Sequence, residues 1–190
     1  MKKRLLTLIV LCGCTVAGYS QPDYVSNLKS TFSVTNDVTA EEESEEAADA
    51  ALAEEFAKNK GKLPWPVDNG FVAIPFGKYS IGDTKLKGNN PGITIGTRKT
   101  NVPVKTVFDG VVSSVDNKGE VTTVFIRHGK YHTVYSNLSG IDVQVGDVVK
   151  KGQIIGSVGE SYGGSGAQGE LSFIIMSGLL NVNPITWLRH

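Results

Sequence analysis

The sequence predicts an all-β domain of antiparallel strands in two packed sheets, preceded by one short acidic helix. Apolar runs of strand length recur after Gly61, and glycine and asparagine separate them. The 190 residues include 22 glycines, and 40% of them are hydrophobic, which is enough for the core of one domain. Only the stretch around residue 50 has a helical composition. We therefore expect one layered β domain with a short helical appendage.

The first twenty residues have the pattern of a secretory signal peptide. Basic residues at positions 2–4 precede the apolar run 5–10, which is too short to span a bilayer. Two processing sites remain open. Small residues favour cleavage after Ser20, whereas Leu11-Cys12-Gly13-Cys14 resembles a lipobox that would leave Cys14 acylated. An exported protein of the periplasm or cell envelope is expected, with membrane attachment only through lipid at Cys14.

Charge divides the remaining chain into two parts. Residues 21–57 contain one basic and ten acidic residues, whereas residues 58–190 contain fifteen basic and nine acidic residues. Residues 21–38 are polar without a sustained period and are expected to form a linker. The mature chain is net negative and exported, which argues against binding to nucleic acid.

Residues 39–60 are expected to form an acidic helical arm. Thr39 and Glu42 form a capping-box pattern, and Gly61 and Pro64 end the helix. Two placements are open: a solvated helix packed loosely on the domain, or an arm that lies across its functional groove. The narrow apolar stripe of this helix consists of Ala48, Leu52, Ala53 and Phe56.

The rest of the chain alternates or runs apolar at strand length. His128-Gly129-Lys130 is expected to be a hairpin turn, and residues 145–154 carry two turn signals around a very short strand. The expected strands are 71–74, 104–107, 111–115, 121–127, 131–135, 143–145, 154–158 and 171–176.

Several segments follow one another in the order of a known family. They include Ile74-Pro75-Phe76-Gly77, Gly92-Ile93-Thr94-Ile95, Arg127-His128-Gly129, Gly146 to Gly156 and Gly169 to Phe173. Together they make residues 59–188 resemble the LytM (lysostaphin-like) metallopeptidase domain. More narrowly, they resemble its degenerate members, the murein hydrolase activators of the EnvC type. The resemblance implies a β-sandwich of the duplicated-hybrid-motif type over residues 61–190.

The active family holds zinc with a His-x-x-x-Asp strand and the second His of a His-x-His strand. At these three positions the chain has Asn90, Thr94 and Ser172. Two further histidines of the family assist the zinc-bound water, and Asn137 and Glu170 occupy those positions. Catalytic zinc takes three side-chain ligands and lowers the pKa of its water toward neutrality. An amide and two hydroxyls are poor zinc ligands, so we expect no metal, no cofactor and no peptidase activity.

The resemblance implies that the metal-free groove binds a partner. That partner would be an N-acetylmuramoyl-L-alanine amidase, activated when the groove captures one of its segments, and the acidic arm could occupy the groove at rest. Two alternatives are a non-catalytic peptidoglycan-binding module that stacks sugars on exposed tyrosines, and a residual zinc endopeptidase. Tyr79, Tyr135 and Tyr162 are the candidate aromatic contacts of the groove. The expected groove residues are Asn90, Thr94, Tyr135, Asn137, Glu170 and Ser172.

Other chemistry has weaker support in the sequence. His128 and His132 flank the hairpin turn, but no Cys or third His joins them to complete a zinc site. The loop Gly163 to Gly166 lacks the Lys-Ser/Thr of a phosphate-binding loop. It is expected to be a flexible loop at the rim of the old site.

Overall fold

The computed structural model describes residues 40–80, 87–119, 121–162 and 166–189. The predicted signal peptide, the lipidation site Cys14, the linker and most of the Gly163 to Gly166 loop lie outside the described residues. Within them, no helix combines the length and the apolar character needed to cross a membrane. The helix and the strands described below belong to one compact unit.

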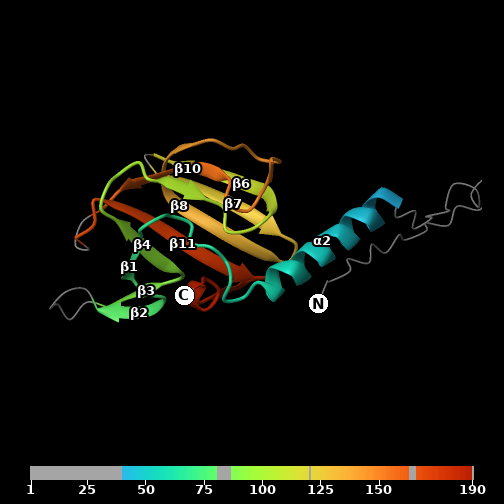
Figure 1. Cartoon of the computed structure of the whole chain (residues 1–190), viewed down its shortest axis with the longest axis horizontal. Coiled ribbons are helices and arrows are strands. Elements are labelled where there is room, and N and C mark those ends of the chain that lie inside the picture. Colours follow the sequence, from blue (N-terminus) through green and yellow to red (C-terminus); the bar gives the residue numbers. More distant parts are fainter. Residues whose placement is uncertain (1–39, 81–86, 120, 163–165, 190) are drawn as a thin grey trace, which may run out of the picture. The chain divides into compact units, whose positions relative to one another are not determined.

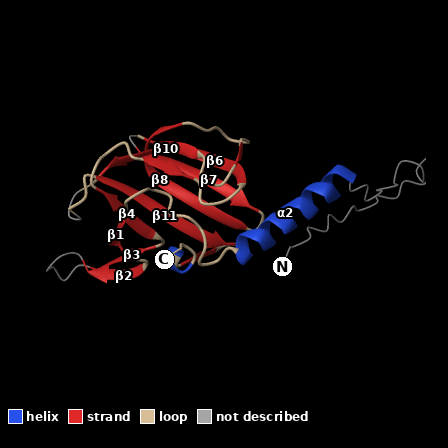
Figure 2. Ribbon diagram, viewed as in Figure 1, coloured by secondary structure: helices blue, strands red, loops and turns tan. Residues whose placement is uncertain are grey.

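The described part of the chain folds into antiparallel strands preceded by one helix, which confirms the predicted fold class (Figures 1 and 2). A separate hairpin of two strands, β2 (Gly77–Ser80) and β3 (Lys87–Asn90), accompanies a main sheet of ten. The main-sheet strands are β1 (Phe71–Ile74), β4 (Ile93–Thr97), β5 (Pro103–Lys105), β6 (Gly110–Lys118), β7 (Val121–His128), β8 (Tyr131–Ile141), β9 (Val148–Val149), β10 (Ile154–Glu160), β11 (Gly169–Ser177) and β12 (Leu180–Val182). The helices are α2 (Ala40–Lys58) and the 3₁₀ turn η1 (Pro184–Thr186).

The long strand β8 connects the two halves of the main sheet. Its residues 131–136 pair with β11, whereas Leu138 and Ile141 pair with β10. On its other side, β8 pairs with β7 along nearly its whole length. The strands therefore follow one hydrogen-bonded path, β1-β4-β11-β10-β8-β7-β6-β9.

One predicted strand is absent, and three strands were not predicted. Residues 143–145 form no strand, because Gly146 has a φ of +93° and the Asp147 carboxylate accepts the backbone N–H of Gln144. These contacts make a turn, although Val143 is still buried. The strands β2 and β3 are short and lack apolar alternation, and β12 has only three residues. The predicted hairpin at Gly129 is confirmed between β7 and β8.

The C-terminal half of α2 packs into the core through Ala53 and Phe56, whereas residues 44–48 are exposed, and this corrects both predicted placements. Phe56 is fully buried, and its ring stacks on those of His128 and Tyr131 with centroids 4.8 and 4.9 Å away. A Cβ atom at Gly129 would collide with the Asp49 carbonyl oxygen, so the helix fits closely against the hairpin turn. The helix is therefore neither loosely packed nor laid across the groove. It closes the end of the sheet where β7 turns into β8.

Candidate functional site

The face of the sheet away from the core carries a groove. Along β7, β8 and β11 alternate side chains point to opposite faces, and those at 124, 126, 135, 171, 173 and 175 are buried in the core. The intervening side chains line an open hollow of about 400 Å³, which we call the open-face groove. Its lining residues are Asp116, Val121, Thr123, Phe125, Val134, Ser136, Ser172, Ile174 and Met176.

The three positions that hold zinc in the active family lie together beside this groove. Thr94 of β4 is the cross-strand partner of Ser172 of β11. Asn90, at the end of β3, donates from its amide nitrogen to the Thr94 hydroxyl over 3.3 Å. The three positions that the family resemblance picked out therefore lie close together in the structure. They come from three strands, two of them adjacent in the main sheet (Figure 1).

The Asn90 side chain already has protein partners for both its amide nitrogen and its oxygen. The Asn90 amide nitrogen also donates to the Ile74 carbonyl, and its side-chain oxygen accepts the Gly92 N–H, each over 3.2 Å. Asn90 is 7% exposed. Its side-chain oxygen, itself a poor zinc ligand, accepts a backbone N–H instead. The neutral set Asn90, Thr94 and Ser172 does not fit a catalytic zinc. Within the described ranges, no three His, Cys, Asp or Glu side chains are grouped to hold a metal.

A second pair of hydroxyls extends the polar cluster across the sheet. Ser136 of β8 is the cross-strand partner of Ser172, and its hydroxyl lies 2.7 Å from that of Thr123 on β7. The hydrogen bond between these two hydroxyls holds both side chains in place and adds no charge to the surface. Sequence motifs did not point to Ser136 or Thr123. The period-two alternation of β7 and β8 is the signal that would have found them.

The two positions that replace the assisting histidines behave differently. Asn137 has a φ of +67° and donates its amide to the carbonyls of Glu160 and Glu170, at 2.9 and 2.8 Å. It ties β8 to β10 and β11 and is not among the residues that line the open-face groove. Glu170 is 8% exposed and lies two residues before Ser172 on the same face of β11. The chain therefore uses Asn137 as a structural link.

The prediction that Tyr135 contacts a ligand in the groove is wrong. Its ring points into the core with no exposed surface and packs 5.3 Å from the ring of Phe173. Its hydroxyl accepts the backbone N–H of Val107. Burial raises the pKa of this phenol. Successive side chains of β8 point to opposite faces of the sheet. Because Ser136 faces the groove, the neighbouring Tyr135 faces the core.

An apolar strip continues from the polar cluster. Phe125, Val134, Ile174 and Met176 line the middle of the groove. A second hollow of about 350 Å³ shares Phe125 and Met176 and reaches His132 and Leu179. The Leu179 side chain is 95% exposed. Phe125, Ile174 and Met176 are partly exposed and Val134 is buried, so the strip is a partly exposed apolar surface that ends at the exposed Leu179.

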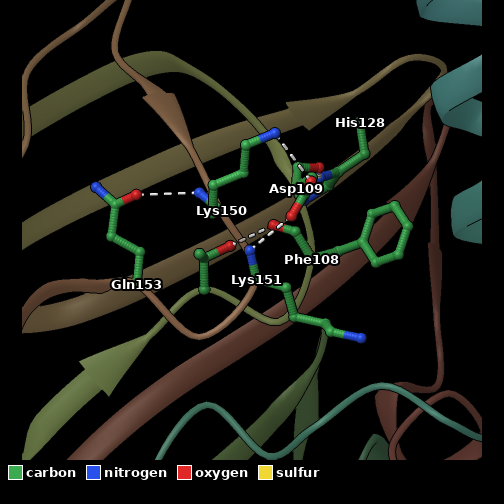
Figure 3. Close-up of polar contacts among 7 residues, drawn as sticks. Phe108, Asp109, His128, Lys150, Lys151 and Gln153 are labelled. Atoms are coloured by element: carbon green, nitrogen blue, oxygen red, sulfur yellow. Dashed lines mark hydrogen bonds and ion pairs between the residues drawn. The ribbon is translucent and has the colours of Figure 1, made fainter.

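The two histidines of the hairpin lie on opposite faces, which explains why they do not form a metal site. His128 is fully buried, with Nδ1 2.5 Å from the Asp109 carbonyl and Nε2 2.9 Å from the Thr133 hydroxyl. Burial lowers the pKa of His128 to about 4. His132 is on the groove side. Figure 3 shows that Asp109 also accepts the Lys151 N–H and the Lys150 ammonium group, so His128 belongs to a structural network.

The fold and the cluster define a peptidase-type domain in which neutral side chains occupy the metal positions. The model of peptidase family M23 matches residues 88–184, and the chain belongs to this family. It is 30% identical over 135 residues to an uncharacterized protein of Haemophilus influenzae. It is also 30% identical over 122 residues to the cell division protein DipM of Caulobacter vibrioides. These matches cover 70% and 63% of this chain but only 30% and 19% of the relatives, so the chain spans a minor part of each.

Solved structures show the same fold. One match is a mutant of the catalytic domain of EnpA, a prophage-encoded M23 protein from Enterococcus faecalis, with a TM-score of 0.54 and 26% identity. This match covers 66% of this chain and 96% of the EnpA chain. Helicobacter pylori Csd3 has a TM-score of 0.53 and 27% identity, with 67% and 33% covered. A chain of the SpoIIQ–SpoIIIAH pore-forming complex has a TM-score of 0.58 at 21% identity, with 68% and 92% covered, and shows the fold alone.

Proposed function

We propose that this protein is a non-catalytic cell-envelope protein that regulates peptidoglycan hydrolysis. It binds an N-acetylmuramoyl-L-alanine amidase through the open-face groove and activates it. The observation that carries the proposal is the neutral set Asn90, Thr94 and Ser172, in which Asn90 is hydrogen-bonded to Thr94, at one end of an apolar groove. A hollow lined by neutral polar groups and a partly exposed apolar strip is suited to binding another molecule.

The groove has the features of a protein-binding surface. Phe125, Ile174 and Met176 are partly exposed at its floor. Aromatic residues and methionine are enriched at protein interfaces, and an apolar-faced helix laid in a groove is a common recognition mode. The hydroxyls of Ser136 and Ser172 at one end offer donors and acceptors for the polar rim.

One relative supports the cellular setting of the proposal. DipM is named as a cell division protein, which agrees with a role at the cell wall during division. The SpoIIQ–SpoIIIAH structures contain this fold within a protein complex. Export to the periplasm or cell envelope remains part of the proposal.

A second candidate is a module that binds peptidoglycan itself without a partner. It is favoured by the basic excess of residues 58–190 and by Tyr162, whose side chain is 73% exposed and could stack on a sugar ring. Retention on purified sacculi that decreases as salt rises, without any amidase, is its expected signature.

One assay separates these functions from residual peptidase activity. The purified chain is mixed with each amidase of its host, and dye release from labelled sacculi is measured with and without a chelator. Release only when both proteins are present, and loss of the effect in Met176→Lys, supports activation. Asp142→Asn, a change at an exposed turn outside the groove, is the control variant. Chelator-sensitive release by this chain alone contradicts the proposal.

A further inference from the structure

The helix α2 meets the open face at the end opposite the polar cluster. Asp49 of α2 forms an ion pair with Arg127 of β7. Arg127 lies two residues beyond Phe125, so the two side chains point to the same face of β7. The cleft beside this ion pair measures about 580 Å³. Its lining residues are Glu45, Glu46, Ala48, Asp49, Val111 and Arg127.

This cleft continues the apolar strip of the groove. His132 is the cross-strand partner of both Arg127 and Met176. His132 and Met176 line the second apolar hollow, and Met176 also lines the open-face groove. A single surface therefore runs from Ser172 over the apolar strip to α2.

The α2 end of this surface is net negative. Glu45 and Glu46 are exposed and face the cleft, where Asp49 and Arg127 offset each other. Among the other described ionisable groups nearby, Lys130 and Glu54 line the hollow on the other side of the helix, and His132 lines the second apolar hollow. The pKa of His132 is lowered by burial and by Arg127, which favours its neutral form. The carboxylates of Glu45 and Glu46 therefore give this cleft its net negative charge.

We infer that α2 forms the acidic end of the partner groove and selects a segment that is apolar along one face and carries lysine or arginine at the end lying against Glu45 and Glu46. The inference rests on the proposed function, because the partner is the activated amidase. The apolar strip supplies the contact area, and the glutamates fix the direction in which the segment lies. Complementary charge at an interface raises the rate of association and sets orientation more than it raises affinity.

The size of the effect follows from the exposure of the glutamates. Exposed ion pairs contribute little each, so removing two of them should weaken binding by roughly 3- to 10-fold. Most of that change should appear in the association rate, and it should vanish as salt screens the charges. A loss that is independent of salt would indicate a different cause.

The test measures binding of the full chain to each purified amidase of its host at low and high salt. Four proteins are compared: wild type, Glu45→Gln/Glu46→Gln, Glu54→Gln/Glu55→Gln and Met176→Lys. The control pair Glu54 and Glu55 lies on the same helix and makes the same change of charge, but lines no part of the cleft beside Arg127. Circular dichroism melts confirm that all four proteins fold.

The expected result is a salt-sensitive loss of affinity in the Glu45/Glu46 variant, wild-type affinity in the control pair and abolished binding in Met176→Lys. Equal affinity of the Glu45/Glu46 variant and wild type, with binding still abolished in Met176→Lys, overturns the role of α2 and leaves the proposed function standing. Absence of binding to every amidase overturns both. Binding that survives Met176→Lys contradicts the groove as the site.

Discussion

The amide nitrogen of Asn90 lies 3.3 Å from the hydroxyl oxygen of Thr94 and donates to it. In active members of the LytM-type family, the residues at these two positions hold a zinc ion between them. Here the two side chains form a hydrogen bond with each other. The Asn90 amide nitrogen also donates to the Ile74 carbonyl, and its oxygen accepts the Gly92 N–H. The positions that hold the metal in the active family therefore still lie together here, but their side chains are an amide and two hydroxyls.

Restoring the ligands should restore metal binding. The triple variant Asn90→His/Thr94→Asp/Ser172→His is expected to bind one zinc per chain, because the three positions already lie together. Metal analysis after dialysis measures this. The variant should still not hydrolyse sacculi, since Asn137 and Glu170 replace the assisting histidines. A folded triple variant without zinc would contradict the arrangement described above.

Phe56→Ala should destabilise the domain by about 3–5 kcal/mol, because a fully buried aromatic ring leaves a cavity when it is removed. Urea unfolding followed by circular dichroism measures the change. Glu54→Ala, on the exposed face of the same helix, is the control and should change stability by no more than about 0.5 kcal/mol. Similar stability of Phe56→Ala and wild type would mean that α2 does not belong to the core.

Stability should decrease as the pH falls from 6.5 to about 4. His128 has its folded pKa lowered to about 4 from 6.5, so in this window the unfolded chain binds a proton that the folded chain excludes. The contribution of His128 is complete above pH 6.5 and is lost on acidification, by about 3 kcal/mol in total. Urea unfolding across this range tests the slope. His128→Gln should be less stable at pH 7 and should show a flatter pH profile; an unchanged slope would refute the assignment.

Tyr135→Phe separates a core role from a groove role. The hydroxyl accepts the Val107 N–H in a fully buried environment, so its loss should cost about 1–3 kcal/mol of stability. Affinity for the partner should not change, because the ring lies on the opposite side of the sheet from the groove. Thermal melts and binding isotherms measure the two quantities. Wild-type stability with weakened binding is the result that would return Tyr135 to the groove.

The elements with strong local patterns were predicted well from the sequence. The acidic helix had a capping pattern and a clear end at Gly61, and β1, β7 and the Gly129 turn had regular apolar alternation or turn residues. The hairpin β2–β3 was missed because it is polar and short. Tyr79 and Gly88 are cross-strand partners in this hairpin, and the Tyr79 ring packs against Gly88. Local sequence carries no signal for such a contact.

The candidate site was only partly predictable. Motif positions found Asn90, Thr94 and Ser172 because ligand spacing is fixed by strand geometry. They misplaced Tyr135 and Asn137, since a motif match does not say which face of β8 a side chain occupies or that a positive φ turns Asn137 toward the backbone. The apolar groove residues come from three separate strands. Only the assembled sheet brings them together.

Zinc binding by the wild-type chain tests the central claim most directly. The purified protein is dialysed against micromolar zinc and then against metal-free buffer, and bound metal is measured per chain alongside the triple ligand variant. We predict negligible zinc in the wild type and one equivalent in the variant. One tightly held zinc per wild-type chain, lost in Ser172→Ala, would contradict the account.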